Sequence, residues 1–389
     1  MTGLLASGWK FDPNRHGTWA VAGTMIVLLF VLPVLEDPLL LLQVRYYVSM
    51  IILALSMAFI WGFGGIMCFG QSMFFGLGGY AYAIAVGNIG ESTAPFFLSM
   101  IIPAIFAAIL GYFMFFGRLN DVYVAVITLA VTLALYYFIN STSGDEYKIG
   151  KARLMGFNGI SSIRKFNWPG DPKSFLTANE LFYFSMGLLL ATYLGLKVLL
   201  GSKFGRVVVA VKENELRAEL LGYDVRAYKL AVFVIGAAIA GLAGCLSINY
   251  KNFISPNAFH LALAAQIIMW VLVGGVGTLF GPIVGCVVLL YVSFILGTGA
   301  ASGGGMNTYF IFGLIVMIFV LVIPQGIVPT IRDWREQIGR YRRMIGGGLL
   351  SLSDQLPAGH GEGMRNLAER LIGVMKSESG PAPGAGTKG

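Results

Sequence analysis

Ionisable side chains, the groups that could perform acid–base chemistry or relay protons, are almost absent from the apolar part of this chain. Between Leu230 and Ile331 the single Asp, Glu, Lys or Arg is Lys251. His260 lies near the expected start of an apolar segment, where we expect an interfacial imidazole, and Glu91 and Asp121 fall at expected segment ends. Enzymes and ion-driven transporters in membranes need such groups at depth. The sequence therefore favours neither class.

Sequence motifs for ATP hydrolysis, for a metal site and for a nucleophilic serine are absent as well. There is no GxxxxGK[ST] phosphate loop, no HExxH and no GxSxG elbow, so we expect no catalytic residue, no metal and no cofactor in this chain. Cys68, Cys245 and Cys286 lie inside apolar segments and show neither metal-ligand nor disulfide spacing. We expect them to be small packed hydrophobic residues.

The charged residues gather instead in one stretch, Lys203–Lys229, between two apolar regions, so this stretch must lie in water. Within it, residues 212–221 are almost all good helix formers, and Gly222 stands where a left-handed residue ends a helix. We therefore expect one short helix. Leu216 and Leu220, four residues apart, would share one of its faces. Such a helix either binds a partner surface or lies as a solvated loop on lipid headgroups, and the spacing alone leaves both open.

Two apolar segments are rich in glycine at positions that would lie within a bilayer. The segment Gly62–Ile84 carries the polar pair Gln71 and Ser72 in its middle, and Leu272–Gly285 carries Thr278 among its glycines. Helices broken within a membrane are tolerated where the freed backbone lines a cavity or is buried in protein, which would suit a solute path. Close helix packing through small residues is the other interpretation, and either segment alone favours it. Two such breaks in one chain strengthen the case for a translocation site.

The elements that must position these segments are long apolar runs. The chain has 389 residues, of which 57% are hydrophobic and 12% charged, whereas soluble domains carry about 25% charged residues. Runs of about 20 apolar residues match helices that cross a bilayer and are too long for barrel strands. We predict an all-α, polytopic transmembrane helix bundle of about ten spans, some broken or partial, at about 18–35, 46–64, 66–87, 94–116, 122–140, 181–200, 230–250, 258–275, 279–297 and 308–326.

Positive charges set the expected orientation. Lys and Arg cluster before the first expected span, in the central charged stretch and after the last span, so all three clusters face one side, the cytoplasm. The N-terminal segment 1–17, the loop 201–229 and the tail 331–389, basic and then disordered, are cytoplasmic on this prediction, and 18–330 forms the membrane domain. The loop 141–180 faces the other side although it is also basic, and its turn residues predict a small structured cap. Basic residues confined to loops and tail indicate no nucleic-acid partner.

Three sequence blocks carry a resemblance to a known family. They are GFGGIMCFGQSMFFGLGGYAYAI (62–84), GRVVVAVKENELRAELLGYDVRAYKLAVFVIGAAIAGLAG (205–244), and ISPNAF followed by LVGGVGTLFGPIVG (254–285). In order and approximate spacing they resemble the permease subunits of ATP-binding-cassette importers for branched-chain amino acids, the hydrophobic amino acid uptake family. The likeness covers roughly residues 45–330.

The resemblance implies an assembly and two sites. A second, related permease, two ATPase subunits that use ATP and an extracytoplasmic solute-binding protein would join this chain in the lipid of the inner membrane, with both termini cytoplasmic. The short polar helix would be a coupling helix that docks on an ATPase through Glu213, Asn214, Glu215, Arg217, Glu219 and Gly222. Solute would move between the broken helices past Gln71, Ser72, Phe74, Phe75, Gly78, Tyr80, Gly274, Gly275, Gly277 and Thr278.

Two alternatives stay open at the level of sequence. Permeases for urea and short amides share all three blocks, and Trp270 ahead of the Gly274–Gly275 pair resembles that branch. A self-sufficient channel for a small neutral solute, which would need no ATPase, is the alternative from another class. A membrane-embedded enzyme is disfavoured because the spans carry so few groups able to do acid–base work.

Overall fold

The computed structural model describes residues 38–144, 146–168, 174–301 and 326–330, together with residues 313, 314 and 317. By its internal contacts the chain divides into two units, Met1–Ile327 and Val328–Gly389, and nearly all of the described residues belong to the first. The expected span 18–35 lies outside the described residues, and so does nearly all of 308–326.

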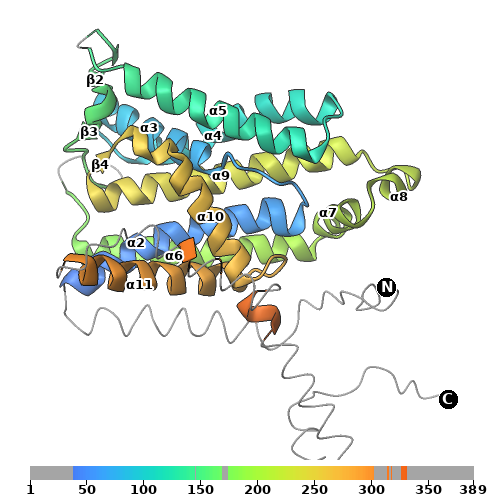
Figure 1. Ribbon diagram of the computed structural model, residues 1–389. Coiled ribbons are helices and arrows are strands. Elements are labelled where there is room, and N and C mark those ends of the chain that lie inside the picture. The colour runs from blue at the N-terminus through green and yellow to red at the C-terminus, as the bar shows by residue number, and fades with distance from the viewer. Residues whose placement is uncertain are drawn as a thin grey trace, which may run out of the picture. The chain divides into compact units, whose positions relative to one another are not determined.

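Helices dominate the first unit (Figure 1). In chain order they are α2 (Pro38–Met57), the π-helix η1 (Ala58–Phe63), α3 (Gln71–Ile89), α4 (Thr93–Phe116), α5 (Asp121–Ser141), the 3₁₀ turn η2 (Gly156–Asn158), α6 (Ala178–Gly201), α7 (Lys203–Glu213), α8 (Glu215–Leu220), α9 (Val225–Lys251), the 3₁₀ turn η3 (Pro256–Phe259), α10 (Leu261–Gly274) and α11 (Gly281–Ala301).

Among the described residues, five helices are long and apolar enough to cross a membrane. They are Gln43–Phe63, Thr93–Phe116, Asp121–Ser141, Ala178–Gly201 and Val225–Lys251. The all-helical membrane fold is thus confirmed, whereas the count of ten spans stays a prediction. The predicted start of the span 66–87 is wrong, because the chain is non-helical between Phe63 and Gln71 and α3 begins at Gln71. The expected span 258–275 was drawn too long: α10 has 14 residues, fewer than the ~20 that a perpendicular crossing needs.

Helix α9 forms the centre of the unit. It packs against α4, α3 and α2, and 72% of its most apolar window is buried, compared with 22% in α4 and in α5. The exposed faces of α4 and α5 carry large apolar side chains such as Ile105, Phe113 and Tyr137. In an apolar multi-pass bundle such faces suit lipid. On the other side of α9, α2 packs against α6 and α11, and α10 packs against α11 (Figure 1).

The loop between α5 and α6 folds as a small cap at the end where α9 finishes (Figure 1). Its strands β1 (Lys148–Ile149) and β2 (Ala152–Arg153) form an antiparallel hairpin, and β3 (Ile160–Ser161) pairs antiparallel with β4 (Phe253–Ile254), which follows α9. Asn249 of α9 accepts hydrogen bonds from the backbone N–H of Phe166 at 2.9 Å and the hydroxyl of Tyr82 at 3.2 Å. The cap is therefore tied to the helices.

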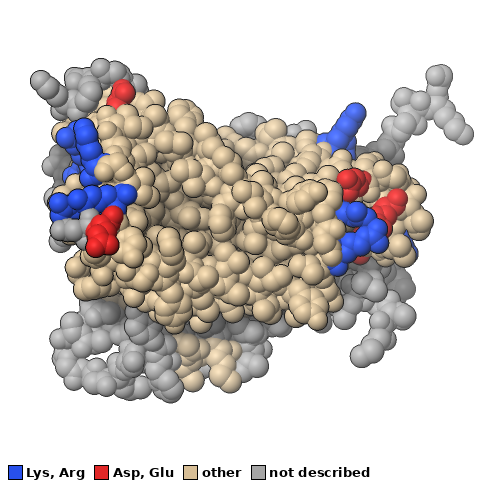
Figure 2. Space-filling view, turned by 90° about the horizontal axis from the view of Figure 1, so that it is seen from above, with Lys and Arg blue, Asp and Glu red and all other residues tan. Residues whose placement is uncertain are grey.

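On the face seen in Figure 2, the charged residues gather at two ends, with an uncharged region between them. One end holds the cap, which carries Lys148, Lys151, Arg153, Arg164 and Lys165. The other end holds α7, α8 and the first turns of α9 (Figure 1). Charges at two ends of an apolar bundle are what a bilayer requires, because charged side chains are costly at its centre.

Candidate functional site

The central charged stretch folds as two helices rather than the single short helix expected for 212–221. Helix α7 ends at Glu213 and α8 begins at Glu215. Between them Asn214 leaves the helical region (φ −162°, ψ 104°), and its Oδ1 accepts a hydrogen bond from the backbone N–H of Arg217 at 2.9 Å. The prediction was wrong because Asn214 was counted as a helix-interior residue, whereas its side chain competes for backbone N–H groups and favours N-caps.

Helix α8 presents its apolar side chains to the outside. Leu216, Leu220 and Leu221 are 66%, 80% and 75% exposed, whereas Ala218 is buried. The residue that ends this segment, Gly222, has φ +86°, the left-handed conformation expected of it. Two exposed leucines on α8 and a third at its C-cap, Leu221, form a surface outside the apolar bundle that suits a protein partner. We call Leu216, Leu220 and Leu221 the α8 leucine face.

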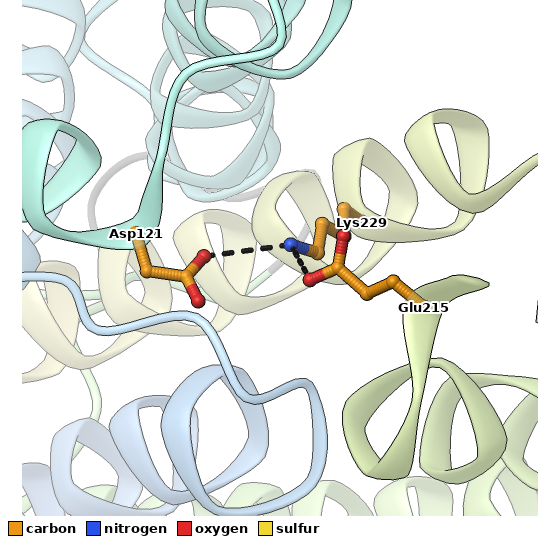
Figure 3. Close-up of polar contacts among 3 residues, drawn as sticks. All are labelled: Asp121, Glu215 and Lys229. Carbon is orange, nitrogen blue, oxygen red and sulfur yellow. Dashed lines mark hydrogen bonds and ion pairs between the residues drawn. The ribbon is translucent and has the colours of Figure 1, made fainter.

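An ion-pair cluster fixes the start of α8 (Figure 3). The Nζ of Lys229, in the second turn of α9, contacts the carboxylate of Glu215 at the start of α8 and that of Asp121 at the start of α5, the latter at 3.4 Å. Both carboxylates are half-exposed, so each contact contributes little to stability. Their role is positional, because one lysine connects three helices. Arg217 and Glu219 are exposed on α8.

A second contact runs from α7 into the first glycine-rich segment. The Nζ of Lys212 donates a hydrogen bond of 2.7 Å to the backbone carbonyl of Gly62, in η1. The lysine stem also lies against Gly65, where an added Cβ would be 2.9 Å from Cγ of Lys212. Burial lowers the pKa of Lys212, and the neighbouring Glu213 partly offsets this. The last turn of α7 is thereby joined to the break between η1 and α3.

The two glycine-rich segments meet at this same place. The turn between α10 and α11 uses Gly275 and Gly277 at φ +114° and +89°, and Thr278 closes it by donating to the Gly275 carbonyl at 3.0 Å and accepting from Gly281 N–H at 3.1 Å. A Cβ added to Gly62 would lie 2.9 Å from the backbone nitrogen of Gly277. Lys212, the η1 break and the α10–α11 turn thus form one contiguous group.

Other predicted path residues are buried in helix contacts. A Cβ on Gly78 would lie 2.3 Å from Cα of Gly241, and one on Gly274 would lie 2.0 Å from the Gly281 carbonyl oxygen. Phe74 packs edge-on against Phe233 of α9, with ring centroids 5.3 Å apart. At Gly78, Gly274 and Phe74, the structure therefore shows close packing between helices.

The polar residues of α3 are buried as well. Gln71 donates through Nε2 to the Ser56 hydroxyl at 2.7 Å and to the Gly236 carbonyl at 3.4 Å. Within the described part of the chain, three buried polar atoms of α3 have no hydrogen-bond partner: Gln71 Oε1, Ser72 Oγ and Tyr80 Oη. Unsatisfied polar atoms in an apolar interior are costly.

A cavity of about 730 Å³ opens at the other end of the bundle, beside β4 and η3. Of the predicted path residues only Phe75 lines it, and sequence reasoning gave no role to Lys251, which also lines it. The signal was present, because Lys251 is the single Asp, Glu, Lys or Arg in the long stretch 230–331. His260, expected to be interfacial, caps α10: its Nδ1 accepts from Ala262 N–H at 3.1 Å.

These features define a multi-pass, all-helical membrane protein with glycine-rich helix breaks and a polar helical segment outside the apolar bundle. Residues 40–321 match the family described as the branched-chain amino acid transport system permease component, and the chain belongs to that family. The resemblance found in the three sequence blocks is confirmed.

Individual relatives agree with this assignment. The chain is 27% identical over 299 residues to the high-affinity branched-chain amino acid transport system permease protein LivM of Escherichia coli K12, covering 72% of this chain and 68% of that protein. It is 26% identical to the probable branched-chain amino acid transport permease protein LivM of Methanocaldococcus jannaschii, covering 68% and 81%. It is also 28% identical to the LivH protein of that organism, over 40% of this chain and 52% of that protein. No solved structure gives a significant match.

Proposed function

We propose that this chain is a permease subunit of an ATP-binding-cassette importer that moves branched-chain amino acids across the inner membrane. Membership of the permease family over residues 40–321 carries the proposal. The chain is similar both to LivM and to LivH proteins, which supports pairing with a second, related permease. The chain itself would do no chemistry: it would take its energy from two ATPase subunits, which use ATP, and its solute from an extracytoplasmic binding protein.

The α8 leucine face is the proposed docking surface for an ATPase subunit. It supports this role because Leu216, Leu220 and Leu221 are exposed at the end of the bundle that the distribution of Lys and Arg over the whole sequence predicts to be cytoplasmic. The cap would then face the binding protein, and both termini would be cytoplasmic. Glu215, Arg217 and Glu219 would add polar contacts around the apolar face.

Two contacts would carry movement from α8 into the membrane. The Lys229 cluster connects α8 with α9 and α5, and the Lys212 hydrogen bond connects α7 with the η1 break, which lies against the α10–α11 turn. Displacement of α7 and α8 by an ATPase would therefore act first on Gly62 and Gly277. We propose that this group controls access from the cytoplasmic side.

Purification of the chain in mild detergent from its native host tests the proposal. We expect an ATP-binding subunit and a second permease to co-purify, and we expect the complex in liposomes to take up leucine only with ATP and a binding protein. Uptake of urea or short amides in place of leucine would move the chain to the urea branch. Flux through the chain alone, without ATP, would refute the importer proposal in favour of a channel.

A further inference from the structure

The cavity beside β4 lies far from the coupling helices. It is bounded by α2, α3, the last turns of α9, β4, η3 and the start of α10. Helix α9 runs from Val225, next to α8, to Lys251, a rise of about 39 Å at 1.5 Å per residue. The cavity therefore opens at the cap end of the unit (Figure 1), the end that would meet the binding protein in the proposed function.

The cavity wall combines one cation with apolar and polar surface. Lys251 is the only Asp, Glu, Lys or Arg among the described residues that line it. Its Nζ lies 4.8 Å from the centroid of the Tyr46 ring, in cation–π contact, and no carboxylate of the described residues pairs with it. Apolar wall is supplied by Met50, Phe75 and Leu263, among others.

The side chain of Lys251 is exposed, so its ammonium group can meet a ligand that arrives from the water at this end of the bundle. Among the described residues no carboxylate competes for it, and an anion within about 4 Å would be attracted to it. A ligand with a carboxylate would complete the pairing, while its apolar side chain would contact the wall near Phe75. Asn257 and Gln266, which also line the cavity, offer amide oxygens to an ammonium group.

We infer that this cavity is the entry site for solute on the permease and that Lys251 binds the solute's carboxylate. The inference rests on the proposed function and narrows it to solutes with a carboxylate, such as zwitterionic amino acids. Neutral urea and short amides have no group that needs this cation. The cavity exceeds the size of one small amino acid several-fold, so it suits transient capture after release from a binding protein.

Direct ligand binding to the purified complex, in lipid nanodiscs and without the binding protein, tests the inference. Saturation-transfer NMR would compare L-leucine with L-leucinamide, which lacks the carboxylate. We expect a preference of about tenfold for leucine, the scale of one hydrogen-bonded charge pair. Lys251→Gln should abolish the preference, and Lys251→Arg should retain it. Lys165→Gln, which changes an exposed lysine of the cap, is the matched control and should behave as the wild type.

Three results would overturn the inference. Leucine and leucinamide could bind the wild-type complex equally, or Lys251→Gln could keep the preference. Alternatively, Lys251→Gln could lose co-purified anionic lipid while leucine binding persists, which would assign Lys251 to a lipid headgroup phosphate. Failure of the proposed function looks different, because the wild-type complex would then take up no branched-chain amino acid at all.

Discussion

Replacing Lys212 by methionine should weaken the connection between the coupling helices and the membrane part. The substitution keeps most of the apolar stem that lies against Gly65 and removes the 2.7 Å hydrogen bond to the Gly62 carbonyl. A hydrogen bond to a charged group contributes about 1.5–3 kcal/mol when buried. Because the lysine is partly exposed, screening by water reduces this to about 1 kcal/mol. A loss of about 1 kcal/mol changes an equilibrium constant by a factor of about five.

The assay is leucine uptake by the reconstituted importer, measured beside its ATP hydrolysis. We expect Lys212→Met to lower uptake about fivefold while assembly is unchanged and ATP is still hydrolysed, because only transmission is impaired. Lys203→Met is the matched control: Lys203 is exposed at the start of the same helix and should have no effect. The proposed route through Gly62 would be refuted if Lys212→Met took up leucine at the wild-type rate. It would also be refuted if Lys212→Met and Lys203→Met lost equal amounts of uptake.

Three further substitutions test packing and coupling separately. Gly78→Ala places a Cβ 2.3 Å from Cα of Gly241 and should lower the free energy of unfolding by about 1–3 kcal/mol. Thermal unfolding should therefore show a lower midpoint for this variant. Gly187→Ala is the control, because Gly187 has open space around it, and its midpoint should not fall. Gly222→Ala must adopt φ +86°, at a cost of about 1 kcal/mol, and should reduce uptake without lowering the yield of folded complex. Lys229→Met removes exposed ion pairs worth about 1 kcal/mol or less. Its uptake should be less sensitive to salt than wild-type uptake, and a salt response equal to that of the wild type would exclude a role for the cluster.

Local features of the chain were predictable from sequence. Gly222 was expected to end a helix in the left-handed conformation, and it does, because a glycine after a run of helix formers can adopt positive φ at no steric cost. The helical membrane architecture followed from the apolar runs. The break at Asn214 was missed because one residue can cap a helix or sit inside it, and propensity alone does not distinguish the two.

Contacts between distant segments could not be predicted in this way. Gly78 meets Gly241, and Lys212 meets Gly62, because the helices cross where both partners are small or where a long side chain reaches a free carbonyl. Sequence periodicity carries no information on which helices cross. Lys251 was the exception, since its isolation in an uncharged stretch was visible. Its role could be argued only once the cavity around it was known.

Site-specific cross-linking from the α8 leucine face tests the central proposal most directly. The three native cysteines are buried, so Leu220→Cys offers one exposed thiol for a maleimide photo-cross-linker. Lys165→Cys, at an exposed site of the cap, is the control. In the native complex we predict that Leu220→Cys cross-links to the ATP-binding subunit and that Lys165→Cys does not. Cross-links from Leu220→Cys to lipid alone would contradict the assignment of α8 as the coupling helix.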